Sequence, residues 1–254
     1  MLSETSAVVP EVEITWAENL GKEPDYVVVA PTSLGVLINL FASKAVGSIR
    51  ISSKAQETEE ASDNDDDYDE DTQLYKSMNK SVLFKSVEFP ILHLDTKVSV
   101  LAILVPYFLN SIAYNVLARA LRDDLRVSHS WITLSPSSLN NGQSLNRLDG
   151  GDVSNRKLPK NSTKSYFQVP KLEPPHSVTG IAAALNSVLY PDNVFVSLIL
   201  NSDGQIGFER TDSDSIVDAA YVLSELVLAD NDYTKTVSKA IRKFNSTNNA
   251  GMYL

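Results

Sequence analysis

The sequence predicts a single α/β domain with a Rossmann-like, mixed and mainly parallel sheet sandwiched by helices. Its 254 residues, 43% of them hydrophobic, supply enough apolar side chains for one large core. Short aliphatic runs alternate along the chain with segments whose apolar residues recur at helical spacing. Residues 98–134 contain a strand, a helix and a strand, the order typical of parallel pairing. We therefore place one domain at residues 1–244, with two long disordered loops inside it and a flexible tail at residues 245–254.

The first predicted strand lies at residues 26–30, where Tyr-Val-Val-Val-Ala forms a short apolar run typical of a buried strand. Pro31-Thr32-Ser33 follows as a turn that can cap a helix. The apolar residues of that helix fall at helical spacing and are Leu34, Leu37, Ile38 and Phe41. A second short strand is predicted at residues 49–51.

An insertion at about residues 52–80 is predicted to be disordered and marks no domain boundary. Its centre, Glu57 to Asp71, carries ten carboxylates and no base. Such a segment buries too little apolar surface to offset the entropy of ordering, so we expect it to be solvated. The alternative is that it steers or repels a charged partner. Because the chain has 32 acidic and 22 basic side chains, removing these ten leaves 22 of each and a folded part near neutrality.

Strand-like segments follow at residues 82–84 and 87–94, and a short polar turn leads from the second into residues 98–105. So short a turn favours an antiparallel pair. The uncharged stretch at residues 98–118 is long enough to be tested as a membrane span, but Pro106 divides it. Beyond the proline, the apolar residues form one stripe of an amphipathic helix, which predicts a soluble domain and no membrane partner. That stripe consists of Leu109, Ile112, Ala113, Val116, Leu117, Ala120 and Leu121.

The second half of the chain continues the alternation. A strand at residues 130–134 is followed by a polar and basic loop at about residues 140–165, which we expect to be disordered and solvated. A helix at residues 180–189 and an apolar strand at residues 194–200 come next.

Two helices complete the predicted domain. Ser213 or Asp214 can cap a helix whose buried stripe extends to Val227. The last helix is predicted from about Asp232 to Phe244. Three bases near its end are suited to interact with its C-terminal dipole, namely Lys239, Arg242 and Lys243.

The composition and motifs argue against most catalytic chemistry. The chain has no cysteine, which rules out disulfides, thiol nucleophiles and cysteine-based metal sites. It shows no phosphate-binding loop and no nucleophile elbow, and His93, His129 and His176 lie far apart in the sequence. We therefore predict no catalytic, cofactor-binding or metal-binding residues. We also find no basic stripe for a phosphate backbone, so no nucleic-acid partner is expected. No secretory leader is recognisable at the N-terminus, which predicts a cytoplasmic or nuclear protein.

The C-terminus carries a short pattern with a functional interpretation. Met252-Tyr253-Leu254 places an apolar residue before a penultimate tyrosine, after a polar stretch at residues 245–251. This is the hydrophobic-Tyr-any motif, with which proteasome activators and chaperones dock. The alternative is an ordinary chain end that packs or frays.

Four segments that precede this motif support its functional interpretation, because their order along the chain matches that of a known family. They are residues 173–181 (EPPHSVTGI), 194–200, 203–210 (DGQIGFER) and 214–218 (DSIVD). Together with the terminal Met-Tyr-Leu, they resemble the last third of the proteasome assembly chaperone 1 family of fungal type. The resemblance covers about residues 80–254, best from residue 171 onward, whereas the acidic insertion and the basic loop depart from the family pattern.

The resemblance implies a non-enzymatic chaperone that acts as a heterodimer with proteasome assembly chaperone 2. In the family, such a dimer sits on the outer face of the 20S α-ring, promotes its correct assembly, and blocks α-ring dimers and premature regulator binding. The implied proteasome-binding residues are Met252, Tyr253 and Leu254, which would enter a pocket between neighbouring α subunits. Whether the chain is chaperone 1 or its paralogous partner stays open.

A rival hypothesis also stays open from the residues alone. A small-molecule enzyme or ligand-binding protein can use the same α/β fold, because fold does not decide function. Such a site would lie at the ends of the strands predicted at residues 98–105 and 130–134, where sheets of this kind bind ligands.

Overall fold

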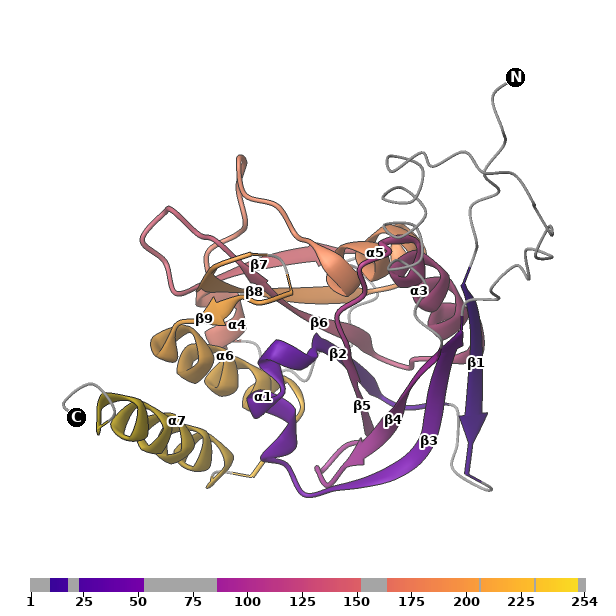
Figure 1. Ribbon diagram of the computed structural model, residues 1–254. Coiled ribbons are helices and arrows are strands. Elements are labelled where there is room, and N and C mark those ends of the chain that lie inside the picture. Colours follow the sequence, from indigo (N-terminus) through magenta and orange to yellow (C-terminus); the bar gives the residue numbers. More distant parts are fainter. Residues whose placement is uncertain are drawn as a thin grey trace, which may run out of the picture.

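One mixed sheet runs through the part of the chain described by the computed structural model, which is residues 10–17, 23–52, 86–151, 164–205, 207–230 and 232–250 (Figure 1). Its strands are β1 (Glu11–Trp16), β2 (Tyr26–Pro31), β3 (Ser43–Ser52), β4 (Ser86–Leu94), β5 (Val100–Val105), β6 (Ser130–Ser137), β7 (Leu145–Gly150), β8 (Phe195–Asp203) and β9 (Arg210–Thr211). Their order across the sheet is β1-β3-β4-β5-β2-β6-β8-β7, and β9 pairs with β8.

Parallel pairing is limited to the four central strands, β5, β2, β6 and β8. The other pairs are antiparallel. These include the predicted pair β4 and β5, in which Leu94 lies opposite Val100. Strands β5 and β6 both run parallel to β2, which lies between them, so the predicted strand, helix, strand unit has the expected direction. The mixed α/β sheet is therefore as predicted, but it is not mainly parallel, because five of its strand pairs are antiparallel and three are parallel.

Helices cover both faces of the sheet, as the sequence predicts. They are η1 (Thr32–Leu34), α1 (Val36–Asn39), α3 (Ile112–Asp124), α4 (Lys164–Gln168), α5 (Gly180–Leu189), α6 (Ser213–Leu226) and α7 (Asp232–Ala250). Helices α3 and α5 pack together on one face, whereas α1, α6 and α7 lie on the other (Figure 1). The result is a sheet between two helical layers.

Strand β2 shows how these residues build a core on both faces. Val27 and Val29 belong to the apolar cluster under α3 and α5, whereas Tyr26, Val28 and Ala30 belong to the cluster under α6 and α7. All five side chains are buried. A continuous apolar run is what a central parallel strand requires, because helices cover both of its sides.

Strand β1 was not predicted from the sequence. It pairs antiparallel with β3 at one edge of the sheet. Exposed and half-buried side chains alternate along it, which is typical of an edge strand with one face toward the core. Its last residue, Trp16, donates a hydrogen bond from Nε1 to Oδ2 of Asp124 at 2.6 Å, which joins the strand to the end of α3.

The predicted loop at residues 140–165 is corrected by β7, which occupies residues 145–150 and pairs with β8. The polar side chains of this segment favoured a solvated loop, but in the structure they are buried and paired with other groups of the chain. Arg147 lies 2.6 Å from the Asp149 carboxylate through Nη1, and its Nε donates to the carbonyl oxygen of Val169 at 2.8 Å. The guanidinium also lies over the ring of Tyr166. The remainder of the predicted loop, residues 152–163, lies outside the described residues.

Two helix boundaries also differ from the predictions. The helix predicted around residues 34–41 is the turn η1 followed by the single helical turn α1, which ends at Asn39, although all four predicted apolar residues are buried. Helix α6 begins at Ser213 with Asp212 at the N-cap, one residue before the earlier of the predicted caps.

Helix α7 is longer than predicted. It continues through Ala250 and does not end at Phe244, so residues 245–250, predicted as part of a flexible tail, are helical. Weak helix formers extend a helix when nothing stops it, and the first glycine in this stretch is Gly251.

Several predictions fall outside the described residues. These are the acidic run at residues 57–71, the strand at residues 82–84 and the C-terminal Met252, Tyr253 and Leu254. In the described part of the chain, no helix has the length and apolar character needed to cross a membrane.

Candidate functional site

Helix α7, which precedes the predicted docking motif in the sequence, lies at the edge of the molecule (Figure 1). Tyr233, near its beginning, donates a hydrogen bond to the carbonyl oxygen of Leu37 at 2.6 Å and stacks on Phe41 with ring centroids 4.0 Å apart. Val237 and Ile241 are buried one and two turns later. The helix continues nine residues beyond Ile241, about 13 Å at 1.5 Å per residue. Met252 therefore follows the helical end at Ala250 after one intervening residue.

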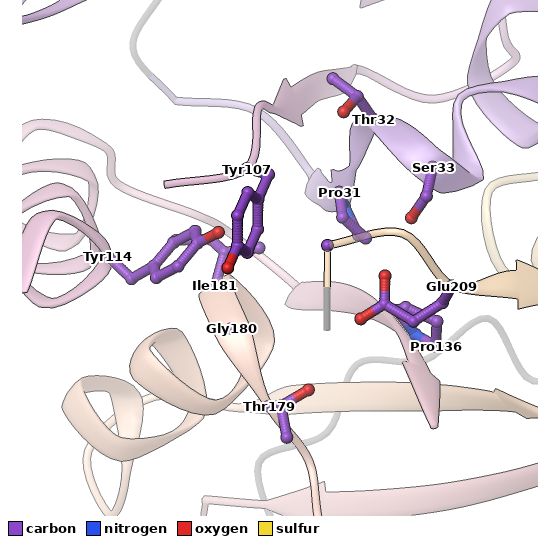
Figure 2. Close-up of a pocket in the computed structure, with 11 residues that line it drawn as sticks. Pro31, Thr32, Ser33, Tyr107, Tyr114, Pro136, Thr179, Gly180, Ile181 and Glu209 are labelled. Atoms are coloured by element: carbon purple, nitrogen blue, oxygen red, sulfur yellow. The ribbon is translucent and has the colours of Figure 1, made fainter. Parts of the chain in front are cut away.

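A second candidate site lies at the carboxyl ends of the central strands, where the rival ligand-binding hypothesis places its site. A cavity of about 40 Å³ opens there, beside the ends of β2 and β6 and the segment after β5. In Figure 2, Tyr107 and Tyr114 lie on one side of this cavity, and Pro136 and Glu209 lie on the other. Small-molecule sites usually enclose about 300 to 1,000 Å³. This cavity is large enough for roughly one or two water molecules.

The polar groups around the cavity are mostly committed or solvated. The backbone N–H of Phe108 donates to the hydroxyl oxygen of Tyr114 at 2.9 Å. Burial raises the pKa of Tyr114 above its ordinary value. Glu209 is half-buried, and among the described residues it makes no hydrogen bond to the hydroxyl groups that line the cavity. The described residues also contain no group of three metal-ligating side chains.

Tyr107, at the edge of this cavity, belongs to a group of exposed apolar side chains that extends beyond the cavity. The large side chains of this group are Tyr107, Leu109, Ile112 and Phe208, which we call the rim patch; Leu109 and Phe208 are 73% and 74% exposed. Tyr107 contacts Phe208 with ring centroids 5.9 Å apart. An open groove of about 410 Å³ continues from the patch between the start of α3 and α5. An exposed apolar surface of this kind is suited to binding another protein.

Tyr107 is held in the rim patch by a glycine. Gly207 has φ +89, a left-handed conformation that glycine adopts without strain, and a Cβ atom there would lie 2.3 Å from the Tyr107 ring. The close approach of ring and backbone fixes where the ring lies. Gly207 thus has a packing role that the sequence alone does not reveal.

The rim patch was missed because the sequence analysis placed Leu109 and Ile112 in the buried stripe of a helix. In the structure, α3 begins at Ile112, so Leu109 precedes the helix and points outward. Pro106, which lacks a backbone N–H and restricts the residue before it, was the signal that the helix starts later.

The predicted residues do not form one site. Met252, Tyr253 and Leu254 lie outside the described residues, and α7 lies on the face of the sheet opposite α3 and α5. The three histidines lie on different parts of the fold: His93 on β4, His129 before β6, and His176 before α5.

Solved structures share this architecture at low sequence identity. The chain is similar to Pyrococcus furiosus PbaA, an archaeal homolog of proteasome-assembly chaperone, with 12% identity and a TM-score of 0.55 over 95% of this chain and 91% of that one. It is also similar to a protein of unknown function from Corynebacterium glutamicum, with 11% identity and a TM-score of 0.52 over 94% and 88%. At these identities the likeness shows the fold.

Comparison of the sequence itself gives two results. No curated protein matches it. A family model described as POC1 chaperone matches residues 1–254.

Proposed function

The chain belongs to the POC1 chaperone family, whose model matches its full 254 residues, and from this premise we propose that it promotes assembly of the 20S proteasome without catalysing a reaction. The family match is the observation that carries the proposal. The fold agrees with it, because PbaA, which shares the architecture, is a homolog of a proteasome-assembly chaperone. The small cavity at the strand ends gives the rival small-molecule hypothesis no added support.

The proposed active species is a heterodimer with proteasome assembly chaperone 2, bound to the α-ring. The rim patch supports a protein partner, since Leu109 and Phe208 expose large apolar side chains beside an open groove. Burying such surface against a partner is favourable at about 25 cal/mol per Å². We propose that the partnership takes place in the cytoplasm or the nucleus.

The proposed contact with the α-ring is made by Met252, Tyr253 and the Leu254 carboxylate, in a pocket between neighbouring α subunits. A charge-assisted hydrogen bond from a pocket lysine would contribute about 1.5 to 3 kcal/mol, and burial of the tyrosine a few kcal/mol more. Ordering each backbone residue costs about 1 to 2 kcal/mol. Because α7 is helical to Ala250, only residues 251–254 have to be ordered, rather than the ten residues of the predicted tail.

These contributions nearly cancel, so the motif should bind weakly by itself. It would act as a second point of attachment once the folded body has docked. Deleting Met252 to Leu254, changing Tyr253→Ala, or adding one residue after Leu254 should each weaken binding to α-ring intermediates. Met252→Leu is the matched control, because it keeps an apolar residue before the tyrosine and should bind like the wild type.

Affinity for purified α-ring intermediates tests the motif, with melting temperature and heterodimer formation measured in parallel. Both of these should be unchanged in every variant. If the three disruptive variants bound with the affinity of the wild type, the motif would not contribute to α-ring binding.

Affinity purification of the endogenous protein followed by mass spectrometry tests the function as a whole. Recovery of α subunits and of a second chaperone of similar size is the expected result. Recovery of neither would contradict the proposed function, and a partner whose binding depends on a metabolite would favour the rival hypothesis.

A further inference from the structure

Helix α7 carries a row of bases on the side opposite its buried residues. At 3.6 residues per turn, Lys235, Lys239, Arg242 and Lys243 fall within about 100° of one another. All four side chains are exposed, and we call them the basic face. Tyr233, Val237 and Ile241, which are buried against the core, point the other way. These four bases share one side of a single helix, which their spacing in the sequence alone does not establish.

The role predicted for three of these bases is not supported by the length of the helix. Lys239, Arg242 and Lys243 were expected to interact with the C-terminal dipole of a helix ending at Phe244. Because α7 ends at Ala250, the nearest of them lies seven residues before the end. The dipole acts within the last turn, so it does not account for this arrangement.

Ion pairs of Lys235, Lys239 and Arg242 among the described residues do not account for their position either. Lys235 lies 3.1 Å from the carboxylate of Asp232, but both side chains are largely exposed, and such a pair contributes little. Among the described residues, Lys239 and Arg242 take part in no ion pair. Residues 233–250 contain no acidic side chain, so the face is strongly positive.

The charges of the neighbouring helix leave most of this face open. Arg242 lines a polar groove together with Asp214 and Asp218 of α6. Lys235 and Lys239 do not line that groove.

We propose that the basic face docks on an acidic patch of a folded protein partner. The face extends about 12 Å from Lys235 to Lys243, which matches a cluster of a few carboxylates. A membrane is disfavoured as the partner because the apolar side of α7 is buried against the core and is not available to insert into lipid. A nucleic acid is disfavoured because it would extend beyond this short face and meet a chain whose formal net charge is -10.

The proposal rests on the proposed function for the identity of the partner. There, the acidic patch belongs to an α subunit and lies beside the pocket that receives the C-terminal motif. Exposed charges act mainly on the rate of association, whereas an inserted tyrosine acts mainly on the rate of dissociation. The two contacts are therefore separable by kinetics.

The test compares two triple variants of equal charge. Lys235→Gln, Lys239→Gln and Arg242→Gln remove three bases of the face, and Lys97→Gln, Arg119→Gln and Arg126→Gln remove three exposed bases elsewhere. Binding kinetics are measured on immobilised α-ring intermediates at about 50 mM and about 500 mM salt. At low salt, the first variant should associate about fivefold or more slowly, with little change in dissociation, and the difference should vanish at high salt. The second variant should associate like the wild type.

A second probe separates this inference from the proposed function. A polyglutamate peptide of about twenty residues should bind the wild type at low salt and bind the first variant several-fold more weakly. The wild type could fail to bind the α-ring and still bind the peptide more tightly than the first variant does. The proposed function would then be wrong, but the inference that the basic face binds acidic groups would be supported. Equal behaviour of both triple variants toward both probes would overturn the inference.

Other occupants of the face give distinct results. The wild type could bind duplex DNA or phosphatidylserine vesicles more tightly than it binds polyglutamate. If the first variant lost that binding, the proposal of a protein partner would be wrong. The chain's own acidic run is the remaining occupant. If the basic face binds that run, the first variant should have a lower melting temperature than the wild type. This difference should disappear when residues 53–72 are replaced by a short Gly-Ser linker in both. That result would also overturn the proposal.

Discussion

Two buried tyrosines differ in what their hydroxyl groups contact. The Tyr233 hydroxyl donates to the carbonyl oxygen of Leu37 at 2.6 Å. The Tyr26 hydroxyl is buried and makes no hydrogen bond within the described residues. An unpaired buried hydroxyl carries the cost of its lost hydration, whereas a paired one recovers it. The same side chain therefore has opposite effects on stability at the two positions.

We expect Tyr26→Phe to leave the free energy of unfolding at pH 7 unchanged or to raise it by up to about 1 kcal/mol. Tyr233→Phe, the matched comparison, should lower it by about 1 to 3 kcal/mol, because the Leu37 carbonyl loses its donor. Urea unfolding of both variants measures the difference. A destabilisation of similar size in both would show that the Tyr26 hydroxyl has a partner in solution.

The same residue predicts a pH dependence. Burial, with a smaller effect of the Asp25 charge, raises the pKa of Tyr26 to about 12. In the unfolded chain the phenol ionises near pH 10, so between pH 10 and 12 the unfolded state releases a proton that the folded state retains. The Tyr26 contribution to stability is thus present below pH 10 and is lost as the pH rises toward 12. Wild type should lose stability over this interval relative to Tyr26→Phe, by about 2 to 3 kcal/mol.

Gly207 predicts a second effect at the residue scale. Gly207→Ala adds a Cβ atom 2.3 Å from the Tyr107 ring at a backbone φ of +89, so both the backbone and the ring must shift. Gly142→Ala is the control, since φ is +73 there but nothing lies within 4 Å of the added atom. We expect a loss of about 1 kcal/mol at Gly142 and about 2 to 4 kcal/mol at Gly207. Calorimetry should show the larger fall in melting temperature at Gly207, whereas equal falls would mean that Tyr107 yields easily.

At the scale of elements, α7 couples the body of the molecule to the C-terminal motif. Its helical residues 245–250 are already ordered before any partner binds. A rigid helix limits the positions that Met252 can reach, whereas a flexible tether of the predicted length would have reached about 25 Å. The direction of the helix, rather than its sequence, then decides where the motif can dock.

Replacing residues 245–249 with glycine should unwind this last part of α7. Helical content measured by circular dichroism should fall by about one to two turns, while the melting temperature of the body stays the same. Affinity for α-ring intermediates should fall about tenfold or more, because the tail must then be ordered on binding. Replacement with alanine is the control and should bind like the wild type. Equal affinity of the glycine variant would mean that the helix has no role in presenting the motif.

Periodicity predicted the elements whose apolar residues face the core without interruption. Strand β2 and helix α3 are of this kind, and both were recognised. The strict alternation from Glu11 to Trp16 contains the signal of β1, but that short segment carries half-buried side chains and was not assigned. Strand β7 was hidden, because Arg147 and Asp149 are buried only as a pair that the folded chain brings together.

Of the candidate binding surfaces, the one made of neighbouring residues in the sequence could be predicted, and those that depend on the folded structure could not. The C-terminal motif was predicted because it is a contiguous pattern. The rim patch joins residues from the β5 to α3 connection with Phe208, about a hundred positions later, and no local pattern reports such a contact. The basic face required the true end of α7, which depends on how far weak helix formers extend a helix.

For the whole molecule, charge is distributed very unevenly. Ten of its 32 acidic side chains lie in the run at residues 57–71, outside the described residues. The described part has 19 acidic and 14 basic side chains, and it carries the rim patch and the basic face on different layers. A partner can therefore be recognised through apolar contact on one side and through charge on the other.

The acidic run should be dispensable for folding. Replacing residues 53–72 with a short Gly-Ser linker should change the melting temperature by no more than a few degrees, because ten like charges contribute little packing and loop length affects stability only weakly. Differential scanning calorimetry measures this. A fall of ten degrees or so would show that the run packs on the domain.

The chain without its partner should self-associate through the rim patch. Light scattering of the purified chain should report oligomers whose fraction rises with concentration, since exposed apolar surface favours association. Leu109→Ser with Phe208→Ser should reduce it. Tyr190→Ser with Tyr221→Ser, which removes two exposed aromatic side chains elsewhere, should not. Co-expression with the second chaperone should keep the wild type soluble, and a stable monomer would argue against an obligate heterodimer.

The hydrogen bond from Tyr233 to Leu37 joins residues 196 positions apart, and this has a consequence for synthesis on the ribosome. At about 5 to 20 residues per second, translation reaches Tyr233 roughly 10 to 40 seconds after Leu37. During that interval, Leu37 and Phe41 have no α7 to cover them. The nascent chain thus exposes apolar side chains that its own distant helix covers only after nearly the whole sequence has been translated.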